Sequence, residues 1–151
     1  RLRAVAELAA AGVPVGVFVA PVIPAITDSE MESVMEAARE AGATTISYTL
    51  VRLPHQVAPL FREWLDVHFP DRAAHVMSLI QQMRGGRDND PRFGSRMRGE
   101  GLFADLLKRR FEIARKRLGF ATREQHVGLR CDLFLAPAKP KPASPQGDLF
   151  G

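Results

Sequence analysis

The sequence of 151 residues contains one cysteine, and this scarcity excludes several kinds of site. A single thiol forms no internal disulfide and no four-cysteine zinc site, and it holds no iron–sulfur cluster without ligands from elsewhere. The four histidines show no metal-ligand spacing, and no Gly-x-Ser-x-Gly or His-Glu-x-x-His pattern is present. We therefore expect no metal site and no catalytic residue here, and we expect Cys131 to be a small packed residue.

Long apolar runs are also missing. No run reaches the length of about 18 apolar residues that a membrane span needs, and no secretory signal opens the chain. We therefore expect a cytoplasmic protein that makes no membrane contact. The chain begins at Arg1, without methionine and within a helical pattern, which favours a piece of a longer protein. We expect the upstream half of that protein to pack against this chain as a partner.

Residues 1–54 alternate between helical and strand patterns. Alanine and leucine in residues 1–11 predict a helix, which a glycine and a proline then end. The valine-rich residues 13–23 predict a strand that is buried on both faces, as in parallel sheets. Pro21 and Pro24 are expected to end this strand, because proline donates no hydrogen bond to a central ladder.

A second helix and a second strand follow. Thr27 stands three residues before Glu30, a capping-box pattern that predicts a helix start. The expected apolar stripe of this helix is Met31, Val34, Met35 and Ala38. Residues 44–51 predict the second strand. The order helix, strand, helix, strand predicts an α/β fold with parallel strands. Because two strands alone form no covered sheet, we expect further strands upstream.

After residue 54 the pattern is helical. Apolar spacing predicts three helices. Five of the chain's twelve glycines lie in residues 85–101, and this concentration predicts an irregular segment. One short strand is predicted over 127–135, and the proline-rich end reads as a disordered tail. The helices are expected at 58–69, 71–83 and 102–118. The predicted parts are residues 1–54, a helical extension 55–135 and a tail 136–151.

Positive charge is concentrated in residues 84–117. This segment carries eleven basic and five acidic residues, a net charge of +6 within a chain of net charge +4. Arginine suits bidentate contacts to phosphate, glycine lets a ligand approach the backbone, and an aromatic ring suits base stacking. We predict substrate or nucleic-acid contacts, to DNA or RNA, in the Arg/Gly loop, residues 84–101. The candidate residues are Arg87, Arg92, Phe93, Arg96 and Arg98. The alternatives are arginines paired with nearby carboxylates, or another anionic ligand.

The last predicted helix raises a further question of charge. Its basic residues Lys108, Arg109, Arg115 and Lys116 share the face opposite the apolar arc and are expected to be solvated. Arg110 and Arg117 fall inside that arc. They either extend past an edge of the packing, the commoner outcome, or meet an acidic group elsewhere.

A resemblance to radical SAM enzymes rests on three stretches of the sequence. Residues 14–54, PVGVFVAPVIPAITDSEMESVMEAAREAGATTISYTLVRLP, resemble the fifth and sixth strand–helix units of a radical SAM barrel. The others, LFREWLDVHFPDRAAHVMSLIQQMRGG and RFGSRMRGEGLFADLLKRRF, resemble the C-terminal part of bacterial proteins of the DNA repair photolyase-like branch, relatives of spore photoproduct lyase. The resemblance covers residues 1–137 and implies a partial (β/α) TIM-like barrel followed by a helical extension.

The resemblance implies two cofactors in the full-length protein, S-adenosylmethionine and a 4Fe–4S cluster. The family's cluster-binding motif, Cys-x-x-x-Cys-x-x-Cys, is absent from this chain, so the cluster ligands are missing here. In the family the carboxyl ends of the strands face the cofactor. The residues expected there, beside the adenine of S-adenosylmethionine, are Val19, Ala20, Pro21, Arg52 and Leu53. Ala25 replaces the glycine that is usual in the turn after the first of these strands.

The last residues carry a separate pattern. Gln146-Gly147-Asp148-Leu149-Phe150 resembles the bacterial sliding-clamp-binding peptide, whose skeleton is Gln-x-x-Leu-Phe. Leu149 and Phe150 would enter an apolar pocket of the clamp while Gln146 sets the register. The alternatives are a tail without function or a short strand that docks on the protein's own core.

Two functions follow from these patterns. The first is the C-terminal section of a radical SAM iron–sulfur enzyme that cleaves S-adenosylmethionine reductively and acts on or near DNA in repair. The alternative is a basic nucleic-acid-binding module without chemistry of its own, tethered to the sliding clamp by its C-terminal peptide.

Overall fold

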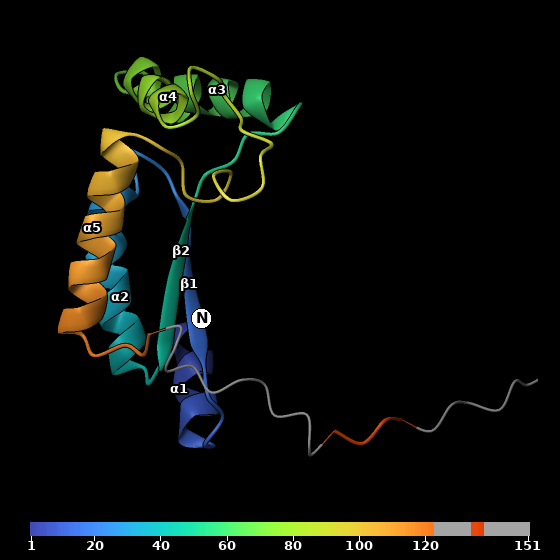
Figure 1. Cartoon of the computed structure of the whole chain (residues 1–151), viewed down its shortest axis with the longest axis vertical. Coiled ribbons are helices and arrows are strands. Elements are labelled where there is room, and N and C mark those ends of the chain that lie inside the picture. Colours follow the sequence, from blue (N-terminus) through green and yellow to red (C-terminus); the bar gives the residue numbers. More distant parts are fainter. Residues whose placement is uncertain (123–133, 138–151) are drawn as a thin grey trace, which may run out of the picture.

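The computed structural model describes residues 1–122 and 134–137 and shows the mixed α/β fold that the sequence predicts (Figure 1). Its elements match the predicted helices and strands to within a few residues. In chain order they are α1 (Leu2–Ala10), β1 (Gly16–Val22), the 3-10 turn η1 (Asp28–Glu30), α2 (Met31–Glu40), β2 (Thr45–Leu50), α3 (Val57–His68), α4 (Ala73–Gln82) and α5 (Leu102–Arg117).

The two strands pair in parallel, as the sequence predicts. Residues 16–19 align with residues 45–48, and Val22 aligns with Leu50, so β1 holds one extra residue before its end. Pro21 lies within this irregular part of β1, after a cis peptide bond. The prediction that Pro21 ends the strand is therefore wrong, because a bulge tolerates a residue that donates no ladder hydrogen bond.

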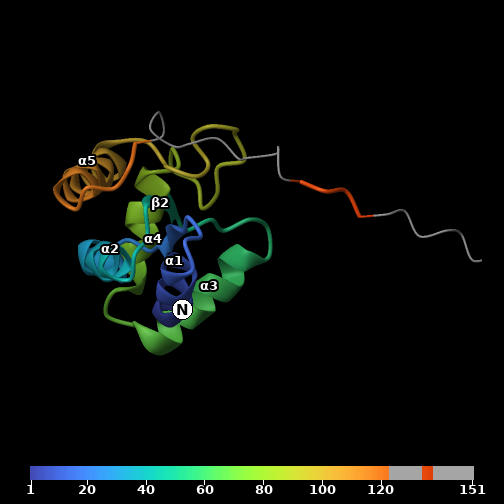
Figure 2. The same ribbon diagram turned by 90° about the horizontal axis from the view of Figure 1, so that it is seen from below.

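α2 and α5 lie side by side over one face of this sheet (Figures 1 and 2). Met31, Met35, Leu107 and Phe111 meet Ile46 in the resulting core. The opposite face is not covered by any described residue, and Phe18 is 70% exposed there. The prediction of a β1 strand buried on both faces is therefore wrong for the described part of the chain, although the valine-rich sequence suits such burial.

The turn between β1 and α2 differs from the predicted capping box. Thr27 does not cap the helix: its Oγ1 accepts a hydrogen bond from the Ile23 N–H at 2.8 Å and donates to the Pro21 carbonyl. The side chain therefore closes the turn behind it, and η1 precedes α2. Ala25 has φ +58°, a left-handed conformation that glycine adopts at lower cost.

α3 and α4 form a layer beyond the carboxyl ends of the strands, with a core of their own (Figure 1). Leu65, Val76 and Ile80 are fully buried there against Leu53. The apolar side chains of α3 are only partly covered, since Leu65 is its one buried residue. α5 returns to the first core, so residues on both sides of the predicted boundary at 54 pack together.

The arginines of α5 do not all follow their expected positions. Arg110 and Arg117 meet acidic side chains of α2, the less common of the two expected outcomes. Arg115 is expected to be solvated, but its side chain is 13% exposed and bonds to Glu112 and to the Phe120 carbonyl. That prediction is wrong because the chain folds back over this face of α5 at Phe120.

The C-terminal end is described only in part. Residues 134–137 form no helix or strand and are exposed. Most of the predicted strand 127–135 and nearly all of the predicted tail lie outside the described residues, as does Cys131. Among the residues that the structure describes, no helix has the length and apolarity to cross a membrane.

Candidate functional site

The Arg/Gly loop is attached to the end of β2 through a buried arginine. Arg84 is 3% exposed, and its two terminal nitrogens donate to the Val51 carbonyl at 3.0 Å and the Ser95 carbonyl at 3.1 Å. Burial lowers the pKa of this guanidinium, and the nearby Asp90 carboxylate opposes that effect. Arg84 therefore serves the structure of the loop, and its charge does not reach a ligand.

The loop then runs along the carboxyl end of β2. The Leu50 N–H donates to the Met97 carbonyl at 3.0 Å, and the Glu100 N–H donates to the Met83 carbonyl at 3.0 Å. Gly99 lies so close that an added Cβ would stand 3.0 Å from the Leu50 side chain. The glycine-rich sequence thus permits the close approach that places the loop at the strand end (Figure 1).

Asp90 organises the middle of the loop. It is 4% exposed and accepts hydrogen bonds from the Arg92 backbone N–H, from the Arg92 guanidinium and from the Ser95 hydroxyl. These bonds, those of Arg92 first, hold the pKa of Asp90 far below its usual value. Arg92 also donates to Glu100 at 3.2 Å. Its guanidinium is therefore engaged within the loop, as the carboxylate-pairing alternative predicts.

A second carboxylate ties the loop to the α3–α4 layer. Asp88 accepts hydrogen bonds from Gln81 at 2.9 Å and from Arg62 at 2.8 and 2.9 Å. The pKa of Asp88 is lowered, first by the Gln81 bond and then by the Arg62 bond. The loop is thus held at Arg84, Asp88 and Asp90.

The remaining loop cations have no such partner. Arg87 and Arg98 are exposed, and among the described residues neither guanidinium donates a hydrogen bond or forms an ion pair. The Arg96 guanidinium lies over the Phe93 ring, 4.0 Å from its centroid, and Phe93 is 90% exposed. Four of the five predicted contact residues therefore remain available to a ligand, and Arg92 does not.

Two hollows meet at Arg98. A cleft of about 590 Å³ runs from Arg98 along β2 to Phe111 and Ala121. A smaller one of about 270 Å³ contains Tyr48, Ser95 and Lys108. Sequence reasoning assigned Lys108 to a solvated helix face and passed over Tyr48. Lys108 lies less than two helical turns after Gly101, the last residue of the loop, and this short separation in the sequence could have indicated that Lys108 lies near the loop.

Tyr48 is a partly buried polar residue that lines the smaller hollow. Burial raises the pKa of its phenol, and the positive charge of Arg98 partly opposes that rise. The ring lies 4.7 Å from that of Phe111, centroid to centroid. Tyr48 therefore remains a neutral hydrogen-bonding group at neutral pH.

The residues expected to border S-adenosylmethionine lie at the ends of the two adjacent strands. Val19 and Arg52 are partly buried, whereas Ala20 and Pro21 are exposed. The Arg52 Nε is buried without a hydrogen-bond partner in the described structure, and Nη1 lies 4.0 Å from the Met97 sulfur. Leu53 is 1% exposed in the second core, where its side chain is not accessible to a ligand.

The chain does not supply the ligands of an iron–sulfur cluster. The sequence has one cysteine, and in residues 1–122 and 134–137 no three His, Cys, Asp or Glu side chains are grouped as metal ligands. A cluster would need thiolates from outside this sequence. The predicted clamp-binding residues Gln146, Leu149 and Phe150 lie outside the described residues.

Comparison with known proteins gives no relative: no family model, no curated protein and no solved structure matches this chain.

Proposed function

We propose that the Arg/Gly loop contacts a nucleic acid, and that the chain is the C-terminal part of a radical SAM enzyme whose substrate this loop binds. One observation carries the proposal: Arg87 and Arg98, which have no acidic partner in the described structure, lie on a loop anchored at the carboxyl end of a parallel strand. Ligands of α/β folds bind at that end of the sheet.

The enzyme part of the proposal is supported by the arrangement of the strands. β1 and β2 are parallel neighbours joined through α2, as successive units of a (β/α) barrel are. Phe18 is exposed on the uncovered face, where further strands and side chains of a barrel would pack. Ala25 adopts a left-handed conformation at the turn where the resembled family has glycine.

This chain would supply the residues on only one side of a cofactor site. When bound, the cluster and S-adenosylmethionine would supply radical chemistry, and their cysteine ligands would come from the upstream half. Val19, Ala20 and Pro21 would offer apolar contact from β1. Arg52 is partly exposed as a whole, and a terminal nitrogen of its guanidinium would donate to an oxygen of the bound molecule.

The nucleic-acid contact is tested by salt-dependent binding of the full-length protein that carries this chain. Each phosphate contact that is lost reduces the slope of log K against log salt concentration by about 0.7 for single strands and about 0.9 for duplex DNA. We expect the double variant R87A/R98A to bind DNA or RNA with a slope smaller by about 1.5. Equal slopes for this variant and the wild type would overturn the contact.

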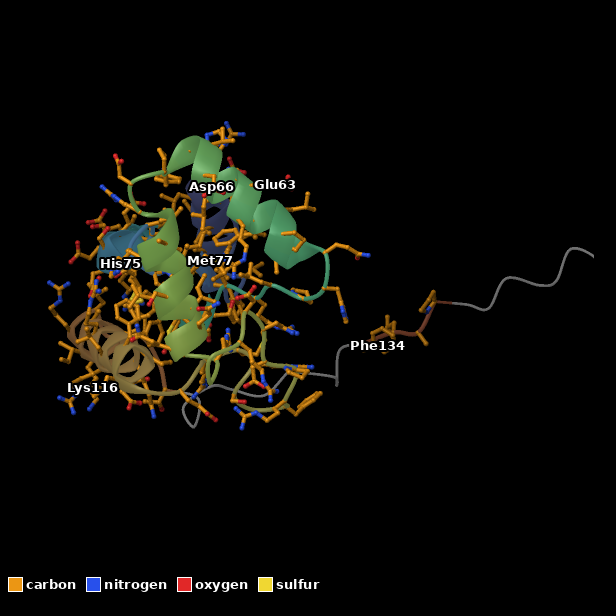
Figure 3. The ribbon with its side chains drawn as sticks, turned by 90° about the horizontal axis from the view of Figure 1, so that it is seen from above. Glu63, Asp66, His75, Met77, Lys116 and Phe134 are labelled. Carbon is orange, nitrogen blue, oxygen red and sulfur yellow. The ribbon has the colours of Figure 1, made fainter. Side chains whose placement is uncertain are left out.

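Lys116→Ala is the matched control for that experiment. Lys116 is an exposed cation without a partner in the described structure, in the last turn of α5 (Figure 3). It lies about 20 Å along the helix from Gly101. Its removal changes the net charge but no loop contact, so binding is expected to stay within about twofold of the wild type. Arg92 is left intact, because its loss would also disturb Asp90.

The enzyme part has a separate test. Anaerobically purified full-length protein is expected to show the visible absorption of a 4Fe–4S cluster and to bind S-adenosylmethionine, and Arg52→Ala is expected to weaken that binding while leaving the cluster absorption unchanged. A protein without cluster absorption would overturn the enzyme part. The loop contact would stand, and the function would then be the binding module without chemistry.

A further inference from the structure

Phe93 presents an aromatic ring to solvent with a guanidinium on one side. The ring is 90% exposed, and the Arg96 carbon Cζ lies 4.0 Å from its centroid. A single cation covers one face of the ring, so the other face is open. Planar guanidinium stacked on an aromatic face is a stable cation–π arrangement, and both flat surfaces accept a further planar group.

The exposed ring belongs to an ordered turn. Arg96 N–H donates to the Arg92 carbonyl at 3.2 Å, and Gly99 N–H donates to the Ser95 carbonyl at 2.7 Å. The buried carboxylate of Asp90 holds both Arg92 and Ser95, one on each side of Phe93. Gly94, with φ +99°, supplies the left-handed residue that the turn needs. The ring is therefore preorganised in the exposed position, which lowers the entropic cost of binding a partner.

The surroundings of the ring favour a nucleic-acid base over an apolar partner. A protein-binding hot spot has an aromatic anchor among other apolar groups. On this loop, Arg87 and Arg98 are exposed and Arg96 is partly exposed over the ring, whereas Met97, at 39%, is the one other exposed large apolar side chain. An aromatic ring among cations is the arrangement with which proteins bind single strands: bases stack on the ring while cations contact the phosphates.

We propose that Phe93 and Arg96 form a stacking platform for an unpaired base, so that the loop selects single-stranded over duplex nucleic acid. Base faces are covered by their neighbours in a duplex and become accessible in a single strand. Arg87 and Arg98 then contact the adjacent phosphates, and in this respect the inference rests on the proposed function. Because stacking uses the face that every base has, the platform tolerates any sequence.

The first test measures fluorescence anisotropy of labelled oligonucleotides of about 20 nucleotides, single-stranded or duplex, with the full-length protein. Phe93→Ala is expected to weaken single-strand binding about tenfold, with the salt slope unchanged, because stacking involves no counterion release. Duplex binding is expected to change less than twofold. Phe134→Ala is the matched control, since Phe134 is also an exposed aromatic residue, 71% exposed and outside the loop (Figure 3).

A second test reports on stacking itself. A single strand that contains 2-aminopurine is expected to lose fluorescence on binding the wild type, because stacking quenches this base, and to keep it with Phe93→Leu. Leucine keeps the apolar volume and lacks the aromatic face, whereas Phe93→Tyr is expected to restore quenching and affinity.

The outcomes separate this inference from the proposed function. If Phe93→Ala or Phe93→Leu binds single strands as the wild type does, the platform is overturned. The platform is also overturned if these substitutions weaken duplex binding as much as they weaken single-strand binding. If R87A/R98A lowers the salt slope in that case, the phosphate contact stands without the platform. If neither set of variants changes binding, both proposals fail.

Discussion

Arg110 of α5 holds the carboxylate of Glu32 on α2 through two parallel hydrogen bonds. Its Nε donates to Oε1 at 2.8 Å and its Nη2 donates to Oε2 at 2.7 Å. The same guanidinium donates to the backbone carbonyl of Asp28 at 2.8 Å and contacts the Asp28 carboxylate at 3.4 Å. One side chain thus links the helix that follows the Arg/Gly loop to the helix that covers the sheet.

We expect Arg110→Ala to lower the free energy of unfolding by about 2 kcal/mol, because hydrogen bonds between charged groups are worth roughly 1.5 to 3 kcal/mol. Both side chains are partly buried, 30% and 29% exposed, so solvent screens the pair only in part. Urea unfolding followed by circular dichroism measures the change. Arg109→Ala is the control: it removes the neighbouring exposed cation and is expected to stay within about 0.5 kcal/mol of the wild type. Equal losses in both variants would contradict the role of the pair.

The same pair predicts a contribution to acid sensitivity. The hydrogen bond from Arg110 is the largest cause that lowers the pKa of Glu32 from 4.5 in the folded protein. The ionised carboxylate therefore stabilises the fold above pH about 4.5, and this contribution is lost as the pH falls through the lowered pKa. Glu32→Gln is expected to lower the melting temperature at pH 7 and to reduce its further fall between pH 5 and pH 3. A parallel pH profile in wild type and variant would contradict this coupling.

Part of that acid sensitivity is expected to remain in Glu32→Gln. Asp88 and Asp90 also have lowered pKa values, and their hydrogen bonds hold the Arg/Gly loop. Protonation of these carboxylates weakens the loop as the pH falls. The difference between the two profiles, and not the presence of acid unfolding, is therefore the informative quantity.

Local patterns were sufficient to predict the helices and the parallel strands. Helical spacing located α2 and α4. Gly12 follows the end of α1 with φ +77°, and Gly42 follows the end of α2 with φ +96°. Each of these features depends on a few neighbouring residues, so the sequence displays it directly. The Thr27 prediction failed because the same hydroxyl also suits a turn, where it bonds to Ile23 and Pro21.

The roles of the loop arginines were only partly predictable for the opposite reason. Composition located the cluster of positive charge, but Arg92 and Arg98 look alike in the sequence. Arg92 lies beside the buried carboxylate of Asp90 and Arg98 does not, a difference that depends on the path of the whole loop. Likewise Arg110 and Arg117 meet carboxylates 78 and 81 positions away in the sequence.

Gly99 and Gly94 form a matched pair for testing how the loop docks. Both have positive φ, +72° and +99°, so an alanine strains the backbone at either position. A Cβ at Gly99 would stand 3.0 to 3.3 Å from Leu50 and Met83, whereas a Cβ at Gly94 meets nothing within 4 Å. We expect Gly99→Ala to destabilise the protein by about 1–2 kcal/mol more than Gly94→Ala.

The readout for this pair is thermal unfolding together with nucleic-acid binding. If close packing at Gly99 positions the loop, Gly99→Ala also weakens single-strand binding, because Arg98 and Phe93 move with the loop. Gly94→Ala changes the turn beside Phe93 without loosening the attachment to β2. Equal melting temperatures for the two variants would show that the contact with Leu50 and Met83 does not hold the loop.

The terminal sequence Gln146 to Phe150 leads to a prediction that is independent of the loop. If it binds the bacterial sliding clamp, Leu149 and Phe150 supply the apolar anchors, and truncating two such anchors is expected to weaken binding at least tenfold. Surface plasmon resonance with immobilised clamp, comparing the full-length protein with its L149A/F150A variant, measures this loss. Asp148→Ala is the control, because position 148 is not fixed in the Gln-x-x-Leu-Phe skeleton. Binding that survives L149A/F150A would refute the clamp contact, and binding lost equally in Asp148→Ala would assign it to the charge of the tail.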